Sequence, residues 1–132
     1  MQGTKDMVKI LIVDDSESLR TQLKRALEEA HYEVVEGTNG LNGLETLKAN
    51  PEVRLILCDV NMPKMDGLSM CRKVRETYPD LRLPIIMITT ESSPEMKATG
   101  KEIGVSAWII KPFIEIKLIS AIKKLLASGA EA

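Results

Sequence analysis

Four short apolar runs with little polar interruption constrain the fold of this chain more than any other feature: Val8 to Val13, Leu55 to Cys58, Ile85 to Ile88, and Ala107 to Ile110. These runs lack the apolar and polar alternation of a half-exposed strand. Strands without alternation are typically buried on both faces, as in parallel sheets covered by helices. The runs therefore predict an α/β protein.

Segments with helical periodicity separate the runs. Ser16 is a candidate N-cap of the first predicted helix, in which the apolar residues recur three and four positions apart: Leu19, Leu23, Ala26, Leu27 and Ala30. Glu33 to Glu36 predicts a short additional strand. Asn39 to Ala49 predicts a helix that ends at Asn50-Pro51 and turns three leucines inward, namely Leu41, Leu44 and Leu47.

The second half of the chain continues this alternation. A helix is expected from about Gly67 to Thr77, and Ser93-Pro94-Glu95 is a good start for another that ends at Gly104. Gly100 within that helix either loosens it or allows close packing. The last helix has an apolar side and a charged side: Ile114, Leu118, Ala121, Ile122 and Leu125 against Lys117, Lys123 and Lys124.

Five strand and helix units with short connections predict a doubly wound, five-stranded parallel sheet with helices on both faces. We expect the strand order 2-1-3-4-5, as in flavodoxin-like folds, which places a crevice between strands 1 and 3. At 132 residues, 44% of them hydrophobic, the chain fits a single domain from 1 to 132 with a core of about 8–126. We therefore expect no attached output domain.

Charged and hydroxyl side chains follow the predicted strands at one edge of the sheet. Asp14-Asp15 follows the first strand, Asp59 the third, Thr89 the fourth and Lys111 the fifth. Each alone is common as a turn, a cap or a surface residue, but this combination in this order points to a functional site. Three neighbouring carboxylates repel one another, so the site must either raise the pKa of a carboxyl group or hold a cation. Mg²⁺ bound by oxygen ligands is the expected cation.

A bound phosphoryl group fits the same residues, because Lys111 and the Thr89 hydroxyl supply positive charge and a hydrogen-bond donor. A carboxylate can itself be the nucleophile and form an aspartyl-phosphate. Asp59 is the candidate, since it is central among the strand tips. His31 is interpreted as a surface residue.

Composition excludes several other classes of function. The net charge is −1 and no dense run of Lys or Arg is present, which argues against nucleic-acid binding. With no secretory signal and no apolar run long enough to cross a membrane, a soluble cytoplasmic protein is expected. Cys58 and Cys71 lack metal-binding spacing and are expected to be reduced and structural.

The residues from Asp59 to Gly67, Asp-Val-Asn-Met-Pro-Lys-Met-Asp-Gly, carry a resemblance to a known family. From about Val8 to Leu126 the chain resembles the receiver domain of two-component response regulators. Within that family, Thr-Thr-Glu-Ser-Ser and Trp-Ile-Ile-Lys-Pro-Phe are most similar to the stand-alone chemotaxis regulators of the CheY type.

The resemblance implies a role for each site residue. Asp59 would accept a phosphoryl group from a sensor histidine kinase, with Thr89 and Lys111 contacting the phosphoryl oxygens. Mg²⁺ would be held by Asp59 itself and three further groups: Asp15 directly, Asp14 mainly through water, and the backbone carbonyl of Asn61. Lys111-Pro112 resembles the family's cis peptide.

Trp108 departs from the family pattern, in which this switch position is usually Tyr or Phe. It is either a core tryptophan or a side chain that swings inward when Thr89 is drawn to the phosphoryl group. The bulk of an indole makes the inward position harder to accommodate.

The resemblance implies a single-domain, monomeric signalling protein. Its phosphorylated form would dock onto a downstream target such as the flagellar motor switch, and the signal would be reset with or without a phosphatase. A phosphorelay shuttle and a phosphate sink would share the site. An aspartate-nucleophile phosphohydrolase is disfavoured because Asn61 stands where a second acid is needed. A nucleotide-binding flavodoxin-like module is weaker still, since no glycine-rich loop follows the first strand.

Overall fold

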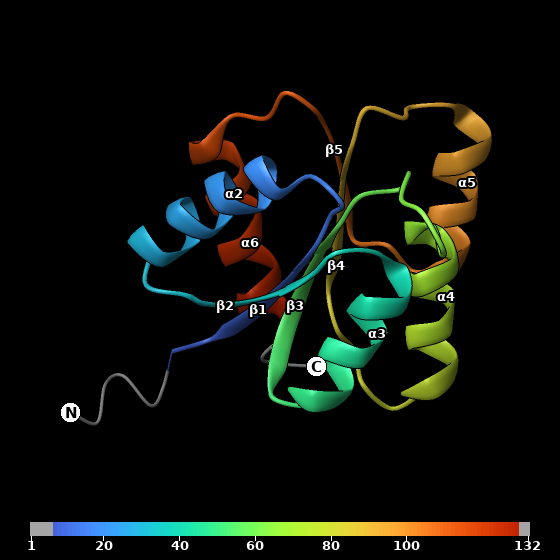
Figure 1. The fold of residues 1–132 in the computed structure, drawn as a ribbon, viewed down its shortest axis with the longest axis horizontal. Helices are drawn as coiled ribbons and strands as arrows, with labels where there is room; N and C mark the ends of the chain where they lie inside the picture. The colour runs from blue at the N-terminus through green and yellow to red at the C-terminus, as the bar shows by residue number, and fades with distance from the viewer. Residues whose placement is uncertain (1–6, 130–132) are drawn as a thin grey trace.

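The computed structural model describes residues 7–129, which form five parallel strands in the order β2-β1-β3-β4-β5 (Figure 1). The strands are β1 (Lys9–Val13), β2 (Glu33–Gly37), β3 (Val53–Cys58), β4 (Ile85–Thr89) and β5 (Ala107–Ile110). The helices are α2 (Glu17–Glu29), α3 (Gly40–Ala49), α4 (Gly67–Thr77), α5 (Pro94–Ile103) and α6 (Glu115–Gly129). This arrangement confirms the predicted fold class and strand order.

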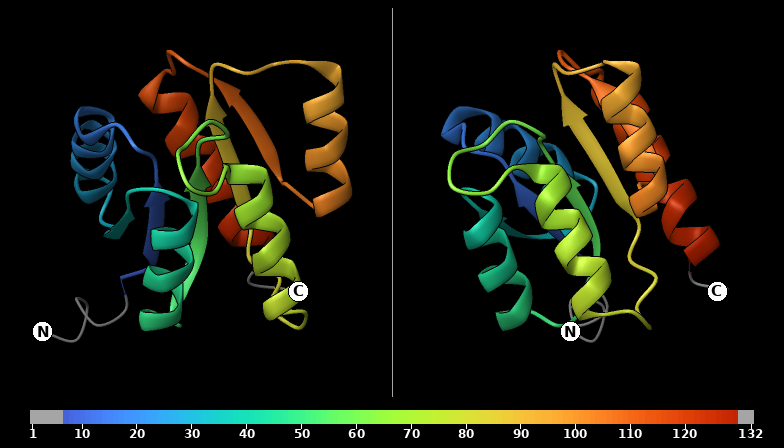
Figure 2. Two further views of the ribbon diagram at one scale, coloured as in Figure 1. Left: turned by 45° about the vertical axis from the view of Figure 1, so that its right-hand side comes forward. Right: turned by 90° about the vertical axis from the view of Figure 1, so that its right-hand side faces the viewer.

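The sheet is the middle of three layers. Helices α2 and α6 cover one face, and α3, α4 and α5 cover the other (Figures 1 and 2). Alternate residues of β1 point to opposite faces: Ile10 and Ile12 pack with α2 and α6, whereas Leu11 and Val13 pack with α3 and α4. Burial on both faces is why the central strands β1, β3 and β4 are apolar with little alternation.

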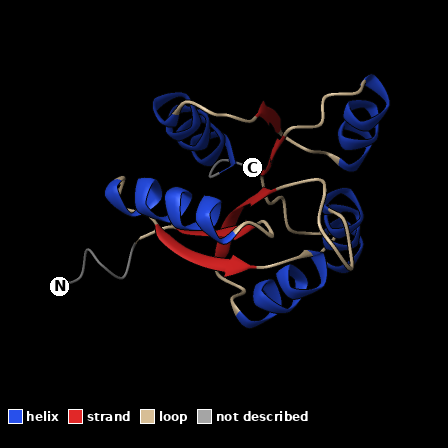
Figure 3. Cartoon of the chain, turned by 45° about the horizontal axis from the view of Figure 1, so that its top comes forward, coloured by secondary structure: helices blue, strands red, loops and turns tan. Residues whose placement is uncertain are grey.

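Caps fix where the helices begin and end, largely at the residues predicted from sequence. Ser16 accepts a hydrogen bond from Leu19 N at the start of α2, and Ser93 does the same from Met96 N at α5. Gly104 ends α5 in the left-handed conformation, with φ of 92°. Figure 3 shows the helices, the strands and the loops that connect them in separate colours. The polar residues described below lie at the carboxyl ends of the strands or directly after them.

Two predicted core residues are wrong. Leu41 is 45% exposed. The side of α3 that packs against the sheet is formed by Gly40, Gly43, Leu44 and Leu47. Leu41 follows Gly40 by one residue and therefore points away from that side. Glycine at position 43 lets α3 approach the sheet, since a Cβ there would lie 3.0 Å from a methyl group of Val13.

Ile114 is the other error. It is 59% exposed, because α6 begins only at Glu115 and the core side of that helix is carried by Leu118 and Ile122. Exposed apolar residues of this kind on a loop next to β5 are available for contact with another protein.

Both cysteines are buried free thiols, as predicted. The Cys71 Sγ lies 4.0 Å from Met87 Sδ, and hydrogen bonding with Cys71, together with burial, raises the pKa of Cys58 well above its usual value. His31 is exposed. Among residues 7–129, no helix combines the length and apolar character needed to cross a membrane.

Candidate functional site

Three aspartates meet at the carboxyl ends of two neighbouring strands. Val13 and Cys58 are register partners in β1 and β3, so the residues that follow them, Asp14 and Asp59, lie side by side. One carboxylate oxygen from each of Asp14, Asp15 and Asp59 lies within 4.8 Å of the others. Asp14 and Asp59 are buried whereas Asp15 is exposed, so the cluster opens to solvent on one side.

Backbone hydrogen bonds hold Asp14 and Asp59 as extensions of the sheet. Asp59 N donates to Val13 O (3.0 Å), and Asp14 N donates to the carbonyl at the end of β2 (3.1 Å). One oxygen of each carboxylate accepts a nearby backbone N–H: Ser16 N on Asp14 Oδ1 (2.8 Å) and Val60 N on Asp59 Oδ1 (2.6 Å). The other oxygen of each carboxylate is left facing the site.

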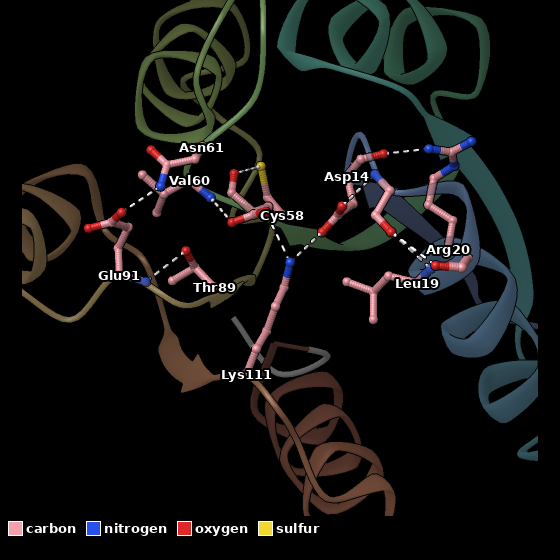
Figure 4. Close-up of polar contacts among 12 residues, drawn as sticks. Asp14, Leu19, Arg20, Cys58, Val60, Asn61, Thr89, Glu91 and Lys111 are labelled. Atoms are coloured by element: carbon pink, nitrogen blue, oxygen red, sulfur yellow. Dashed lines mark hydrogen bonds and ion pairs between the residues drawn. The ribbon is translucent and has the colours of Figure 1, made fainter.

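Lys111 brings the positive charge. Its Nζ lies 3.1 Å from Asp14 Oδ2 and 3.0 Å from Asp59 Oδ2 (Figure 4). Burial lowers the pKa of Lys111, but hydrogen bonds and the charges of both aspartates outweigh it and raise the pKa overall. Burial raises the pKa of Asp14 in spite of hydrogen bonds from Ser16 and Lys111. The site thus holds more negative charge than its one ammonium group neutralises.

The donor set fits a hard divalent cation. Mg²⁺ takes oxygen ligands and keeps several waters, and the Asp14, Asp15 and Asp59 cluster offers carboxylate oxygens on an open side. Asn61 lies in the β3–α4 loop, and its side chain donates from Nδ2 to Glu91 Oε2 (2.6 Å). The metal-binding role of the Asn61 carbonyl stays a prediction.

Thr89 is fully buried at the end of β4. Its Oγ1 accepts a hydrogen bond from Glu91 N (3.2 Å), which ties the hydroxyl to the β4–α5 loop (Figure 4). Glu91 therefore joins Thr89 through its backbone and Asn61 through its side chain. Sequence reasoning assigned no role to Glu91, although it lies in the Thr-Thr-Glu-Ser-Ser segment that contributes to the family resemblance.

Trp108 is half-buried, and its Nε1 donates to the backbone carbonyl of Glu91 (2.8 Å). The ring lies against α5, where a Cβ at Gly100 would be 3.0 Å from Trp108 Cζ3. Gly100 is buried and gives the indole its space, which favours close packing over a loosened helix. Trp108 is thus linked through Glu91 to the same loop as Thr89.

Two backbone features shape the loops around the aspartates. The Lys111-Pro112 peptide is cis, as the resemblance implied. Gly67 N donates to Val60 O (2.8 Å) at the start of α4, and a Cβ on Gly67 would lie 1.8 Å from Asp59 O. Only glycine fits beside Asp59 at this position.

Comparison with known proteins places this site in a family. The model of the response regulator receiver domain matches residues 10–123. The chain belongs to the response regulator receiver domain family. Receiver domains are signalling proteins rather than classical enzymes, and they bind Mg²⁺ through an acidic pocket of the kind seen here.

The receiver domain is similar to several chemotaxis regulators. It is 40% identical to the chemotaxis protein CheY1 of Helicobacter pylori over 107 residues, which is 80% of this chain and 86% of the relative. With the CheY homolog of Campylobacter jejuni it shares 35% identity over 124 residues, covering 93% and 95% of the two chains.

Solved structures show the same likeness. Chemotaxis protein CheY4 of Vibrio cholerae has a TM-score of 0.83 at 37% identity, covering 89% of this receiver domain and 98% of that chain. A CheY-like receiver domain protein of Methanospirillum hungatei has a TM-score of 0.89 at 29% identity, covering 96% and 98%. Family membership implies a histidine kinase partner and a downstream target.

Proposed function

We propose that this receiver domain accepts a phosphoryl group on Asp59 from the phosphohistidine of a sensor kinase and signals by docking onto a separate target protein. The observation that carries the proposal is the position of Lys111 Nζ between Asp59 and Asp14, with Asp15 beside them. This arrangement combines a nucleophilic carboxylate, a cation site and a fixed ammonium group in one place.

In the transfer, a carboxylate oxygen of Asp59 forms a bond to phosphorus. The bond between phosphorus and the kinase imidazole breaks, and its electron pair returns to the ring nitrogen. Mg²⁺ held by Asp14, Asp15, Asp59 and the Asn61 carbonyl would neutralise charge on the phosphoryl oxygens. Lys111 needs little movement to pair with those oxygens, because it already contacts Asp59.

The phosphoryl group becomes a signal through Thr89. Phosphorylation adds a charge of about −1.5 to −2 and strong acceptor oxygens, which draw the Thr89 hydroxyl away from Glu91 N. The β4–α5 loop follows, and Trp108 moves with it because its Nε1 is bonded to the Glu91 carbonyl. The readout face is α5, β5 and α6, where Ile110 and Ile114 are exposed.

The chemotaxis relatives support a target in motility, such as the flagellar motor switch, and a cytoplasmic location. They match this chain over most of their own length, which supports a role for this receiver domain like theirs, in which a separate protein reads the signal. Loss of the phosphoryl group from Asp59, by self-dephosphorylation or with the help of a phosphatase, would reset the signal.

The test is incubation with acetyl phosphate and Mg²⁺, followed by intact mass and Trp108 fluorescence. A gain of one phosphoryl group is expected, absent from Asp59→Asn and from samples with EDTA. Asp66→Asn is the matched control, because Asp66 is an exposed carboxylate in the same loop and asparagine keeps its capping role. Phosphorylation of Asp59→Asn to the same extent, or none in the unaltered protein, would refute the proposal.

A further inference from the structure

Arg20 in the first turns of α2 contacts the backbone of the acidic pair. Its Nη1 donates to Asp14 O (2.6 Å) (Figure 4). Its Nε donates to Glu36 Oε1 on β2 (2.9 Å). The side chain of Arg20 is only 11% exposed. One guanidinium group therefore joins α2, the end of β1 and the neighbouring strand β2.

The carbonyl of Asp14 needs this donor. The chain leaves the sheet after Asp14, so the next turn offers no strand partner for that oxygen, and an unpaired buried carbonyl is costly. A charged guanidinium is a stronger donor than a neutral group. Its planar shape allows it to donate to Glu36 at the same time, which fixes the direction from which it reaches Asp14.

Electrostatics gives this contact a functional consequence. The carboxylates of Asp14, Asp15 and Asp59 repel one another, and in the absence of a restraint the Asp14-Asp15 turn would relax to separate them. Two hydrogen bonds hold the backbone at Asp14: its carbonyl accepts from Arg20, and its N–H donates to the carbonyl at the end of β2.

We propose that Arg20 is a positioning residue for the cation site: it holds the Asp14-Asp15 turn in the conformation that binds Mg²⁺. The inference rests on the proposed function, because it assigns to this site the Mg²⁺ that supports phosphorylation of Asp59. Arg20 touches neither the phosphoryl group nor the ion in this role. It acts through the Asp14 backbone.

Lys24 supplies a matched control one turn further along α2. Its Nζ lies 3.8 Å from Glu36 Oε2, so it pairs with the same acid as Arg20. Its side chain is 44% exposed. Replacing Lys24 removes a cation that pairs with Glu36 and leaves the hydrogen bond from Arg20 to the Asp14 carbonyl in place.

The experiment compares Arg20→Met, Arg20→Lys and Lys24→Met by calorimetric titration with MgCl₂ and by amide exchange at Ser16 without metal. Arg20→Met is expected to weaken Mg²⁺ binding about tenfold or more, as loss of a group that orients a metal ligand does. Lys24→Met should stay within about twofold, because an exposed ion pair contributes little. Arg20→Lys should keep part of the Mg²⁺ affinity that Arg20→Met loses, because a lysine ammonium group can still donate a good hydrogen bond to a single acceptor.

Exchange at Ser16 reports the turn directly, because Ser16 N donates to Asp14 Oδ1. It should be faster in Arg20→Met and unchanged in Lys24→Met. If Arg20→Met lowers thermal stability but leaves both Mg²⁺ affinity and Ser16 exchange unaltered, the residue only packs α2 on the sheet and the inference is overturned.

Two further outcomes are decided by the same design. Absence of Mg²⁺ binding by the unaltered protein would defeat the proposed function, and Ser16 exchange would still decide the role of Arg20. Should Arg20→Met fail to fold, Glu36→Met keeps Arg20 and removes the acceptor that anchors its Nε. Glu36→Met is expected to weaken Mg²⁺ binding and to speed Ser16 exchange relative to the unaltered protein, and unchanged binding and exchange in this variant would overturn the inference.

Discussion

Lys111 Nζ lies 3.0 Å from Asp59 Oδ2 although these residues end strands that are not neighbours. Strand β4 lies between β3 and β5, and the lysine reaches across its tip, where Thr89 is fully buried. The ammonium group thus couples the edge strand β5 to the aspartates at the centre of the sheet. A movement of β5 at Lys111 must therefore affect the aspartates, and a change at the aspartates must affect β5.

Lys111→Met should destabilise the metal-free protein, because it leaves two buried carboxylates without their cation. We expect a loss of about 1–3 kcal/mol in the free energy of unfolding in EDTA. Added Mg²⁺ should restore more stability to this variant than to the unaltered protein, since it replaces the missing positive charge. Thermal melts with and without Mg²⁺ measure both effects. The exposed Lys101 on α5, replaced in the same way, should change neither; an equal Mg²⁺ effect in all three proteins would contradict this explanation.

Asp14→Asn should stabilise the metal-free protein at neutral pH. Because burial raises the pKa of Asp14, the folded state favours its neutral form. That contribution to stability is complete below the ordinary carboxyl pKa and is lost as pH rises through the raised value. The increase in the free energy of unfolding caused by Asp14→Asn should therefore be largest near pH 7 and shrink as pH falls towards 4. Urea titrations in EDTA at several pH values test this, and a gain independent of pH would show that relief of charge is not its cause.

Gly100→Ala tests the packing of Trp108. Alanine is better than glycine in a helix by about 0.8–1.0 kcal/mol, but its Cβ would lie 3.0 Å from Trp108 Cζ3, and overpacking costs about 1–3 kcal/mol. We expect slight destabilisation and a shift of Trp108 fluorescence.

The matched background is Trp108→Phe, which has no atom in the position of Cζ3. There Gly100→Ala should be neutral or stabilising. Denaturation of the four proteins gives the coupling between the two positions. Equal effects of Gly100→Ala in both backgrounds would mean that the ring does not limit the space at position 100.

Gly67→Ala should be far more damaging than the same change at Gly104. A Cβ at Gly67 would lie 1.8 Å from the carbonyl oxygen of Asp59, so the backbone of the phosphoacceptor itself must move. We expect a loss of at least about 3 kcal/mol, the upper range for overpacking. Gly104→Ala, where φ is 92° and a Cβ would lie at ordinary van der Waals distance from the Arg75 guanidinium (3.6 Å from Nε), should cost only about 1 kcal/mol. Denaturation of both variants makes the comparison, and similar losses would contradict it.

Much of the fold and site was predictable because the relevant signals are local. Strand positions follow from apolar runs, and α2 and α5 begin at their predicted caps, Ser16 and Ser93. Periodicity failed at Leu41 and Ile114, where a residue is apolar but no neighbouring element covers it. The glycines at positions 40 and 43 of α3 were the available sign that a different side of the helix approaches the sheet.

The order of residues along the chain is enough to place acids, a hydroxyl and a lysine at one edge of the sheet, because each of them ends or follows a parallel strand. Which of their atoms come into contact depends on the packing of the folded protein. The reach of Lys111 across β4, the hydrogen bonds of Glu91 to Thr89 and Trp108, and the hold of Arg20 on Asp14 join segments remote in the chain. Such contacts depend on how helices and loops pack against the sheet, and local patterns of polarity carry no information about that packing.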